Sequence, residues 1–144
     1  MTIQQIAAND PAARQVWQLR EEVLRKPLGL SLKNEDLSGE KEEVILAATQ
    51  GPELVGCVLL RLLPNGKARL RQMAVATPWQ GKGVGKALLE SAEAVAIEKE
   101  ALFMELHARE SAVGFYEAAG YHTTGEPFEE VGIPHIKMEK TFSL

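Results

Sequence analysis

The chain has 144 residues, of which 45% are hydrophobic and 25% charged, and its formal net charge is −4. These values are ordinary for a globular protein, and one domain over residues 1–144 is long enough to bury its own core. The acidic balance argues against a nucleic-acid partner, since such proteins usually carry a basic surface. No apolar stretch approaches the roughly 20 residues of a membrane helix, and no signal peptide is recognisable, so we expect no membrane partner and a cytoplasmic location.

The first third of the chain predicts a strand, a helix and an irregular segment. Residues 2–7 favour a short strand. Asp10 supplies an N-cap, and the proline that follows suits the first helical position. Apolar residues then recur at helical spacing to about Arg25, where Pro27 ends the helix. Residues 27–41 are expected to be irregular or to hold one short helix.

The middle of the chain is rich in strand-forming residues. We expect strands over residues 43–49, 53–63 and 67–75, separated by Gly-Pro and Pro-Asn-Gly turn signals. A glycine-rich loop and a long amphipathic helix follow, to about Glu100. Residues 101–107 are predicted to form the next strand.

The last part of the chain predicts one more helix and two strands. Ser111 is expected to cap a helix that Gly120 ends. Strands are expected at 121–124 and 135–142, around a polar loop. This order of elements predicts an α+β fold with a mixed, mostly antiparallel sheet flanked by helices, rather than a doubly wound sheet.

The most informative segment is the loop Gln80-Gly81-Lys82-Gly83-Val84-Gly85-Lys86, which follows the apolar stretch Met73-Ala74-Val75. Its three glycines allow a ligand to approach the backbone closely. Free N–H groups at the start of a helix, together with the helix dipole, favour an anion. The segment therefore predicts a phosphate or pyrophosphate site.

Two common nucleotide-binding motifs do not match this loop. A Walker A sequence requires Ser or Thr after Gly-Lys, where this chain has Ala87. In a Rossmann fingerprint the third glycine would fall on Lys86 or Leu88. A nucleotide-binding α/β protein is thus disfavoured, and a glycine-rich turn that merely caps a structural helix remains the simplest alternative.

Three segments carry a family resemblance. The spacing of Gln80, Gly83 and Gly85 resembles the pyrophosphate-binding loop, Gln/Arg-x-x-Gly-x-Gly/Ala, of the GNAT superfamily of N-acetyltransferases. The segment Ala112-x-x-Phe115-Tyr116-x-x-x-Gly120-Tyr121 resembles a second hallmark of that family. Gly132-Ile133-Pro134-His135-x-x-Met138 is similar to a signature of its ElaA-type branch. The order of predicted elements also resembles the GNAT fold along the whole chain.

The resemblance implies acetyl-CoA as the co-substrate, no metal, and direct attack of a primary amine on the thioester. It places the pantetheine along the strand that ends at Val75 and the pyrophosphate on the loop. Arg109 stands where the family often has glutamine or asparagine, and its charge suits a phosphate. The residues expected to bind the cofactor are Met73, Ala74, Val75, Gln80, Gly81, Lys82, Gly83, Val84, Gly85, Lys86, Arg109 and Phe115.

Candidate catalytic residues follow from the same resemblance. Tyr116 is the candidate acid for the leaving thiolate, since a phenol and an alkyl thiol have comparable pKa values; its alternative is a core aromatic. Glu105 and His107 share one face of the strand beside the cofactor strand and are candidate bases. Both could equally be structural, and the base could be water. His122 is expected at the surface.

The acceptor site is expected between the first helix, the loop after it and the last hairpin. Its candidates are Arg20, Glu130 and His135, with Glu35, Asp36 and Glu129 as further carboxylates there. Carboxylates would favour a cationic amine, carried by a small molecule or a peptide. A homodimer through the last strand is an expectation by analogy. The alternative function is a module that binds CoA or acyl-CoA without turnover; the presence of Tyr116 favours the enzyme.

Overall fold

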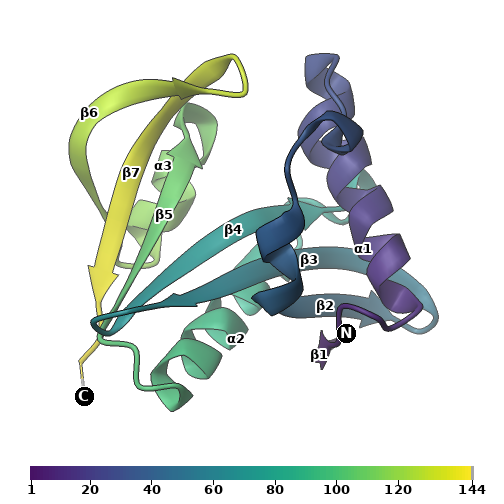
Figure 1. Ribbon diagram of the computed structural model, residues 1–144, viewed down its shortest axis with the longest axis horizontal. Coiled ribbons are helices and arrows are strands. Elements are labelled where there is room, and N and C mark those ends of the chain that lie inside the picture. Colours follow the sequence, from purple (N-terminus) through teal and green to yellow (C-terminus); the bar gives the residue numbers. More distant parts are fainter. Residues whose placement is uncertain (144) are drawn as a thin grey trace.

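A computed structural model describes residues 1–143. Seven strands form one sheet in the order β1-β2-β3-β4-β5-β7-β6 (Figure 1). Neighbouring strands are antiparallel except β4 and β5, which are parallel. The sheet is therefore mixed and mostly antiparallel, as predicted. The strands are β1 (Thr2–Ile6), β2 (Val44–Gln50), β3 (Glu53–Leu63), β4 (Lys67–Val75), β5 (Phe103–Arg109), β6 (His122–Glu130) and β7 (Ile133–Thr141).

Three α-helices flank the sheet: α1 (Ala12–Arg20), α2 (Val84–Glu98) and α3 (Val113–Ala118). The Asp10 carboxylate accepts a hydrogen bond from the Ala12 N–H at 2.8 Å, as a capping residue would, but the residue that directly precedes α1 is Pro11. The regular helix ends earlier than predicted, and a wider π-helical turn carries the chain on to Arg25. Short 3₁₀ turns lie at Lys26–Leu28, Leu32–Asn34, Ser38–Glu42, Thr77–Trp79 and Glu110–Ala112.

The two faces of the sheet pack against different helices. Because strand side chains alternate between faces, Val58 and Leu60 of β3 pack with α2, whereas Leu59 packs with Val16 of α1. Gly56 allows α2 to approach β3 closely, since a Cβ atom there would lie 2.8 Å from Val84 Cγ1. This close contact fixes where α2 begins and where the glycine-rich loop before it lies.

Strands β4 and β5 separate partway along their length. Their pairing runs only from Lys67 and Phe103 to Leu70 and Leu106. Both strands continue beyond that point, and Figure 1 shows them diverging. The sheet therefore opens at its centre, between two strands that are each held by a partner on the other side.

A β-bulge interrupts β4 at Gln72. Cys57 pairs with Ala74, whereas Leu59 pairs with Arg71, so the register shifts between them. Gln72 has φ +57°, a left-handed conformation that is uncommon for a residue other than glycine. Nothing in the sequence predicted this bulge, because glutamine carries no turn signal.

Two predictions for the last third of the chain are wrong. The expected polar loop after residue 124 is mostly strand, and β6 and β7 are joined at Val131 and Gly132, both with positive φ as in a tight hairpin turn. The polar sequence of β6 reflects its position at the sheet edge. Ser111 does not cap α3, which begins at Val113 without a side-chain cap. Gly120 follows α3 with φ +97°, as predicted.

Among residues 1–143, no helix has both the length and the hydrophobicity that crossing a lipid bilayer requires.

Candidate active site

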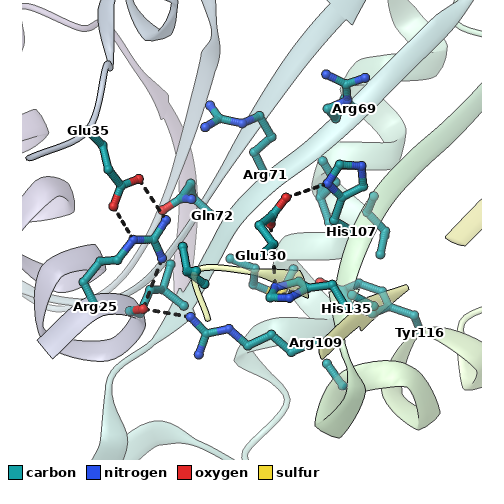
Figure 2. A pocket seen from close by; sticks show the side chains of 17 residues that line it. Arg25, Glu35, Arg69, Arg71, Gln72, His107, Arg109, Tyr116, Glu130 and His135 are labelled. Carbon is teal, nitrogen blue, oxygen red and sulfur yellow. Dashed lines mark hydrogen bonds and ion pairs between the residues drawn. The ribbon is translucent and has the colours of Figure 1, made fainter. Parts of the chain in front are cut away.

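A cavity of about 440 Å³ lies where β4 and β5 separate. Its walls come from both strands, the π-helical turn after α1, α3 and the β6–β7 hairpin (Figure 2). Elements far apart in the sequence therefore meet at one opening in the sheet. Among its lining residues are Arg25, Gln72, Met73, Arg109, Tyr116 and Glu130.

The glycine-rich loop presents unpaired backbone donors. Gly81 and Gly83 have φ of +76° and +85°, and a Cβ atom at either position would meet nothing within 4 Å. Among the described residues, none of the backbone hydrogen bonds in turns, loops and caps has an N–H group of residues 81–86 as its donor. Lys82 and Lys86 are exposed beside them. The loop thus has the free donors, open space and positive charge that an anion requires.

Two loop residues contribute in ways the sequence did not indicate. The Gln80 side chain donates a hydrogen bond to the Val75 carbonyl at 3.0 Å, so it ties the loop to the end of β4. Val84 is buried in the core at 2% exposure, and only its backbone faces the loop. Both residues therefore position the loop through contacts within the chain.

The loop and the cavity are adjacent. A Cβ atom on Gly85 would lie 3.6 Å from Met73 Sδ and 3.4 Å from Phe115 Cζ. The same Met73 sulfur lies 4.0 Å from the Tyr116 hydroxyl, which donates to it. Met73 therefore connects the start of α2 to the cavity wall through direct contacts.

Tyr116 was interpreted from the sequence either as the catalytic acid or as a core aromatic, and its position in the structure suits both. It is 8% exposed and part of the core, yet it also lines the cavity. Burial raises the pKa of its phenol to about 12. At neutral pH the hydroxyl is therefore protonated and able to donate a proton or a hydrogen bond.

Two histidines enclose the carboxylate of Glu130. His107 Nδ1 lies 3.0 Å from Glu130 Oε1, and His135 Nε2 lies 3.6 Å from Glu130 Oε2 (Figure 2). His135 Nδ1 donates to the Ile133 carbonyl at 3.0 Å. The Phe128 ring packs against both imidazoles. Three residues that the sequence named separately thus form one cluster on the cavity wall.

Glu105 lies in an ion cluster rather than in the cavity wall. It is 1% exposed and contacts Arg69 at 2.6 Å, Lys67 at 3.0 Å and Lys137 at 3.6 Å. Burial raises its pKa, but hydrogen bonds from Arg69 and Lys67 and the charges of both residues outweigh burial and hold the pKa below its usual value. A carboxylate held in this way is a weak base, so its placement favours the structural alternative.

Arg20 is also held within the chain. It is 3% exposed, and its guanidinium makes a bidentate pair with Glu40 at 2.9 and 2.7 Å. Its Nε atom donates to the Gln72 side chain at 3.1 Å. Arg20 therefore supports the bulge from behind the cavity wall and does not line the cavity.

Arg109 reaches across the cavity, toward the turn after α1. Its Nη2 atom donates to the Leu24 carbonyl at 2.8 Å, and Arg25 Nη1 donates to the same oxygen at 3.1 Å. Burial and the charge of Arg25 lower the pKa of Arg109. The resemblance placed Arg109 among the cofactor residues, whereas Arg25 was expected only as the end of an ordinary helix and not as a site residue.

The remaining candidates divide between cavity and surface. Glu35 lines the cavity, paired with Arg25 at 2.6 Å. Asp36 and Glu129 are exposed and do not line it. His122 is exposed, as predicted.

The sequence matches the acetyltransferase (GNAT) domain over residues 10–142. It is 34% identical over 76 residues to the Bacillus subtilis protein YyaT, an alignment that covers 53% of this chain and about half (51%) of YyaT. A second Bacillus subtilis protein, provisionally named an acetyltransferase, is 26% identical over 129 residues, which cover 86% of each chain.

Solved structures share the fold. A provisionally named N-acetyltransferase from Lactobacillus plantarum is 26% identical with a TM-score of 0.85, covering 98% of this chain and 99% of that one. Escherichia coli ElaA is 20% identical with a TM-score of 0.82, covering 96% and 98%. A GNAT acetyltransferase from Elizabethkingia anophelis with acetyl-CoA bound is 21% identical with a TM-score of 0.74, covering 98% and 97%. The chain belongs to the GNAT acetyltransferase family and has its fold, a mixed seven-stranded sheet flanked by helices.

Proposed function

We propose that the protein transfers an acetyl group from acetyl-CoA to a primary amine, which attacks the thioester directly. The observation that carries this proposal is the opening between β4 and β5, which joins a loop of free N–H groups to the cavity that Tyr116 lines. Membership of the family supports acetyl transfer, and the nature of the acceptor is part of the proposal.

Residues 81–86 would hold the pyrophosphate of acetyl-CoA through their N–H groups, with Lys82 and Lys86 adding charge. Beyond Leu70 the β5-facing side of β4 lacks a strand partner, so backbone groups of residues 73–75 suit an extended pantetheine. Phe115 is 39% exposed beside this path. When bound, acetyl-CoA supplies the activated carbonyl.

Two proton movements accompany the transfer. The amine must lose a proton to become nucleophilic, and Glu130, held by His107 and His135, is placed to accept it. The departing sulfur must gain a proton, and the Tyr116 hydroxyl is the donor in the cavity wall. In this account Tyr116 is the acid, whereas the His107–Glu130–His135 cluster is the base in place of Glu105.

The wider setting rests on analogy. We place the reaction in the cytoplasm, with a small-molecule or peptide amine as acceptor. A homodimer formed through the last strands is the assembly that the family suggests.

Amine-dependent release of CoA tests the function. The purified protein is incubated with acetyl-CoA and a panel of amines, free thiol is measured, and the acetylated product is identified by mass spectrometry. Transfer to at least one amine supports the proposal. Tight CoA binding without transfer to any amine would instead favour a module that binds CoA without turnover.

A further inference from the structure

The cavity is richer in arginine than the sequence suggested. Arg25, Arg69, Arg71 and Arg109 all line it. Three of them contact a carboxylate directly. Arg25 contacts Glu35 at 2.6 Å, and Arg69 contacts Glu105 at 2.6 Å. Arg71 contacts Glu43 at 2.5 Å and Glu40 at 3.2 Å.

Arg109 differs from the other three. Within residues 1–143, no carboxylate oxygen lies within 4.0 Å of its guanidinium nitrogens. Its hydrogen bond goes to the Leu24 carbonyl, which carries only a partial charge. The cavity wall therefore contains one guanidinium that no carboxylate of the described chain contacts directly, and the charge of Glu130 acts on it only from a longer distance.

Arg25 adds to this excess of positive charge. Its Nη1 atom lies 3.1 Å from the Leu24 oxygen, and Arg109 Nη2 lies 2.8 Å from the same atom. Two guanidinium groups this close repel each other, and the single carboxylate of Glu35 balances only one of them. An anion between them would relieve the repulsion, and the planar guanidinium suits the oxygens of a carboxylate or phosphate.

We infer that the acceptor amine also carries an anionic group, either a carboxylate or a phosphate, and that Arg109 and Arg25 bind this group. This inference rests on the proposed function. The opposite charge lies in the same cavity. Glu130 lines the same cavity as Arg109, and Figure 2 shows its contacts with His107 and His135. An acceptor with both groups places its amine at Glu130 and its anion at Arg109. An acceptor with only a positive charge would be repelled by the guanidinium of Arg109.

Matched acceptors test this inference. L-tyrosine is compared with tyramine, and phosphoethanolamine with ethanolamine, in the CoA-release assay. We expect the anionic member of at least one pair to have the higher kcat/KM, and the preferred pair identifies carboxylate or phosphate. Arg109→Gln should raise KM for that member about tenfold or more, whereas KM for the partner that lacks the anionic group should not rise. Arg14→Gln, an exposed control on α1, should change neither.

Three results would overturn the inference. The first is a higher kcat/KM for tyramine and ethanolamine than for their anionic partners, and the second is the same change in KM for both members of a pair in Arg109→Gln. The third is a loss of CoA affinity in Arg109→Gln as large as the loss of acceptor affinity. The last result would make Arg109 a cofactor contact.

A binding measurement separates this inference from the proposed function. N-acetyl-L-tyrosine and phosphoethanolamine are titrated into the protein saturated with CoA. Binding that Arg109→Gln abolishes supports the anion site even where no amine is acetylated, in which case only the proposed function fails. Acetylation of ethanolamine without binding of either anion would preserve the function and refute the inference.

Discussion

Arg20 holds the side chain of Gln72 at the one place where β4 departs from regular strand geometry. The Arg20 Nε atom donates to Gln72 Oε1 at 3.1 Å, and Gln72 has φ +57°. A buried arginine therefore supports the bulge at the edge of the cavity. Since β4 parts from β5 just before this residue, the contact links the core under α1 to the shape of the proposed cofactor path.

Substitutions at Gln72 test whether the bulge constrains the backbone. Gln72→Val should lower the free energy of unfolding by about 1–3 kcal/mol relative to Gln72→Gly, because a β-branched residue resists positive φ and glycine does not. Both variants lose the amide that contacts Arg20, so the difference reports on the backbone. Urea denaturation measures it, and equal stability of the two variants would contradict the assigned conformation.

Gly83→Asp should abolish CoA binding measured by titration calorimetry. The substitution puts a negative charge beside the N–H groups of residues 81–86, where the pyrophosphate is proposed to bind. Gly51→Asp is the matched control, because Gly51 also has positive φ (+58°) and nothing within 4 Å of its Cβ position. Both variants should lose similar stability, about 1 kcal/mol. Normal CoA affinity in Gly83→Asp would remove the loop from the cofactor site.

Tyr116→Phe should lower kcat by about a hundredfold or more and leave CoA affinity unchanged. Within residues 1–143, the one hydrogen bond of this hydroxyl goes to the Met73 sulfur at 4.0 Å, so little stability should be lost. Tyr121→Phe is the control: that hydroxyl donates to Glu93 at 2.8 Å, outside the cavity. Unchanged kcat in Tyr116→Phe would eliminate Tyr116 as the acid.

Glu130→Gln should lower kcat/KM by about a hundredfold at neutral pH, since a general base contributes about that much. The loss should shrink as the pH rises toward the pKa of the free amine, because the acceptor then arrives without its proton. Glu129→Gln changes the neighbouring residue, which is exposed and does not line the cavity, and should be neutral. If kcat/KM of Glu130→Gln is lowered by the same factor at every pH, Glu130 is not the base.

Stability at low pH should depend on Glu105. Its folded-state pKa is lowered, so it stabilises the protein above its unfolded-state pKa of about 4.3, and this contribution is lost as the pH falls through the folded-state value. Glu105→Gln should be less stable at neutral pH, because Arg69, Lys67 and Lys137 lose their counter-charge, and its stability should fall less on acidification. Parallel stability curves for wild type and variant would exclude this role.

The parts of the fold that were predicted correctly are those with local sequence patterns. β4 was predicted at its observed bounds, and α2 within two residues of its end, because apolar periodicity and turn signals are local properties. The bulge at Gln72 and the loss of pairing after Leu70 were not predicted, since both arise from packing between distant segments. The two strands of the last hairpin were expected, but the full length of β6 was missed because an edge strand need not alternate apolar residues.

In the site, too, features set by local sequence were predicted, whereas features set by contacts between distant segments were not. Glycine spacing was enough to indicate the loop, and the resemblance of residues 112–121 to a GNAT motif indicated Tyr116. The partners of Glu105 and Arg20 come from other strands and loops, so their ion pairs were not visible in the sequence. Arg25 was overlooked because the π-helical turn that places it in the cavity wall has no recognised sequence signal.

The most direct test of the account is a thermal shift of the protein with acetyl-CoA, CoA, ATP and NAD in parallel. A ligand at a hundred times its dissociation constant should add about 2.7 kcal/mol to the stability of the folded state. We expect a rise in Tm with acetyl-CoA and CoA and none with ATP or NAD. A rise with ATP or NAD alone, or no rise with either CoA species, would contradict the proposal that the opening between β4 and β5 is an acetyl-CoA site.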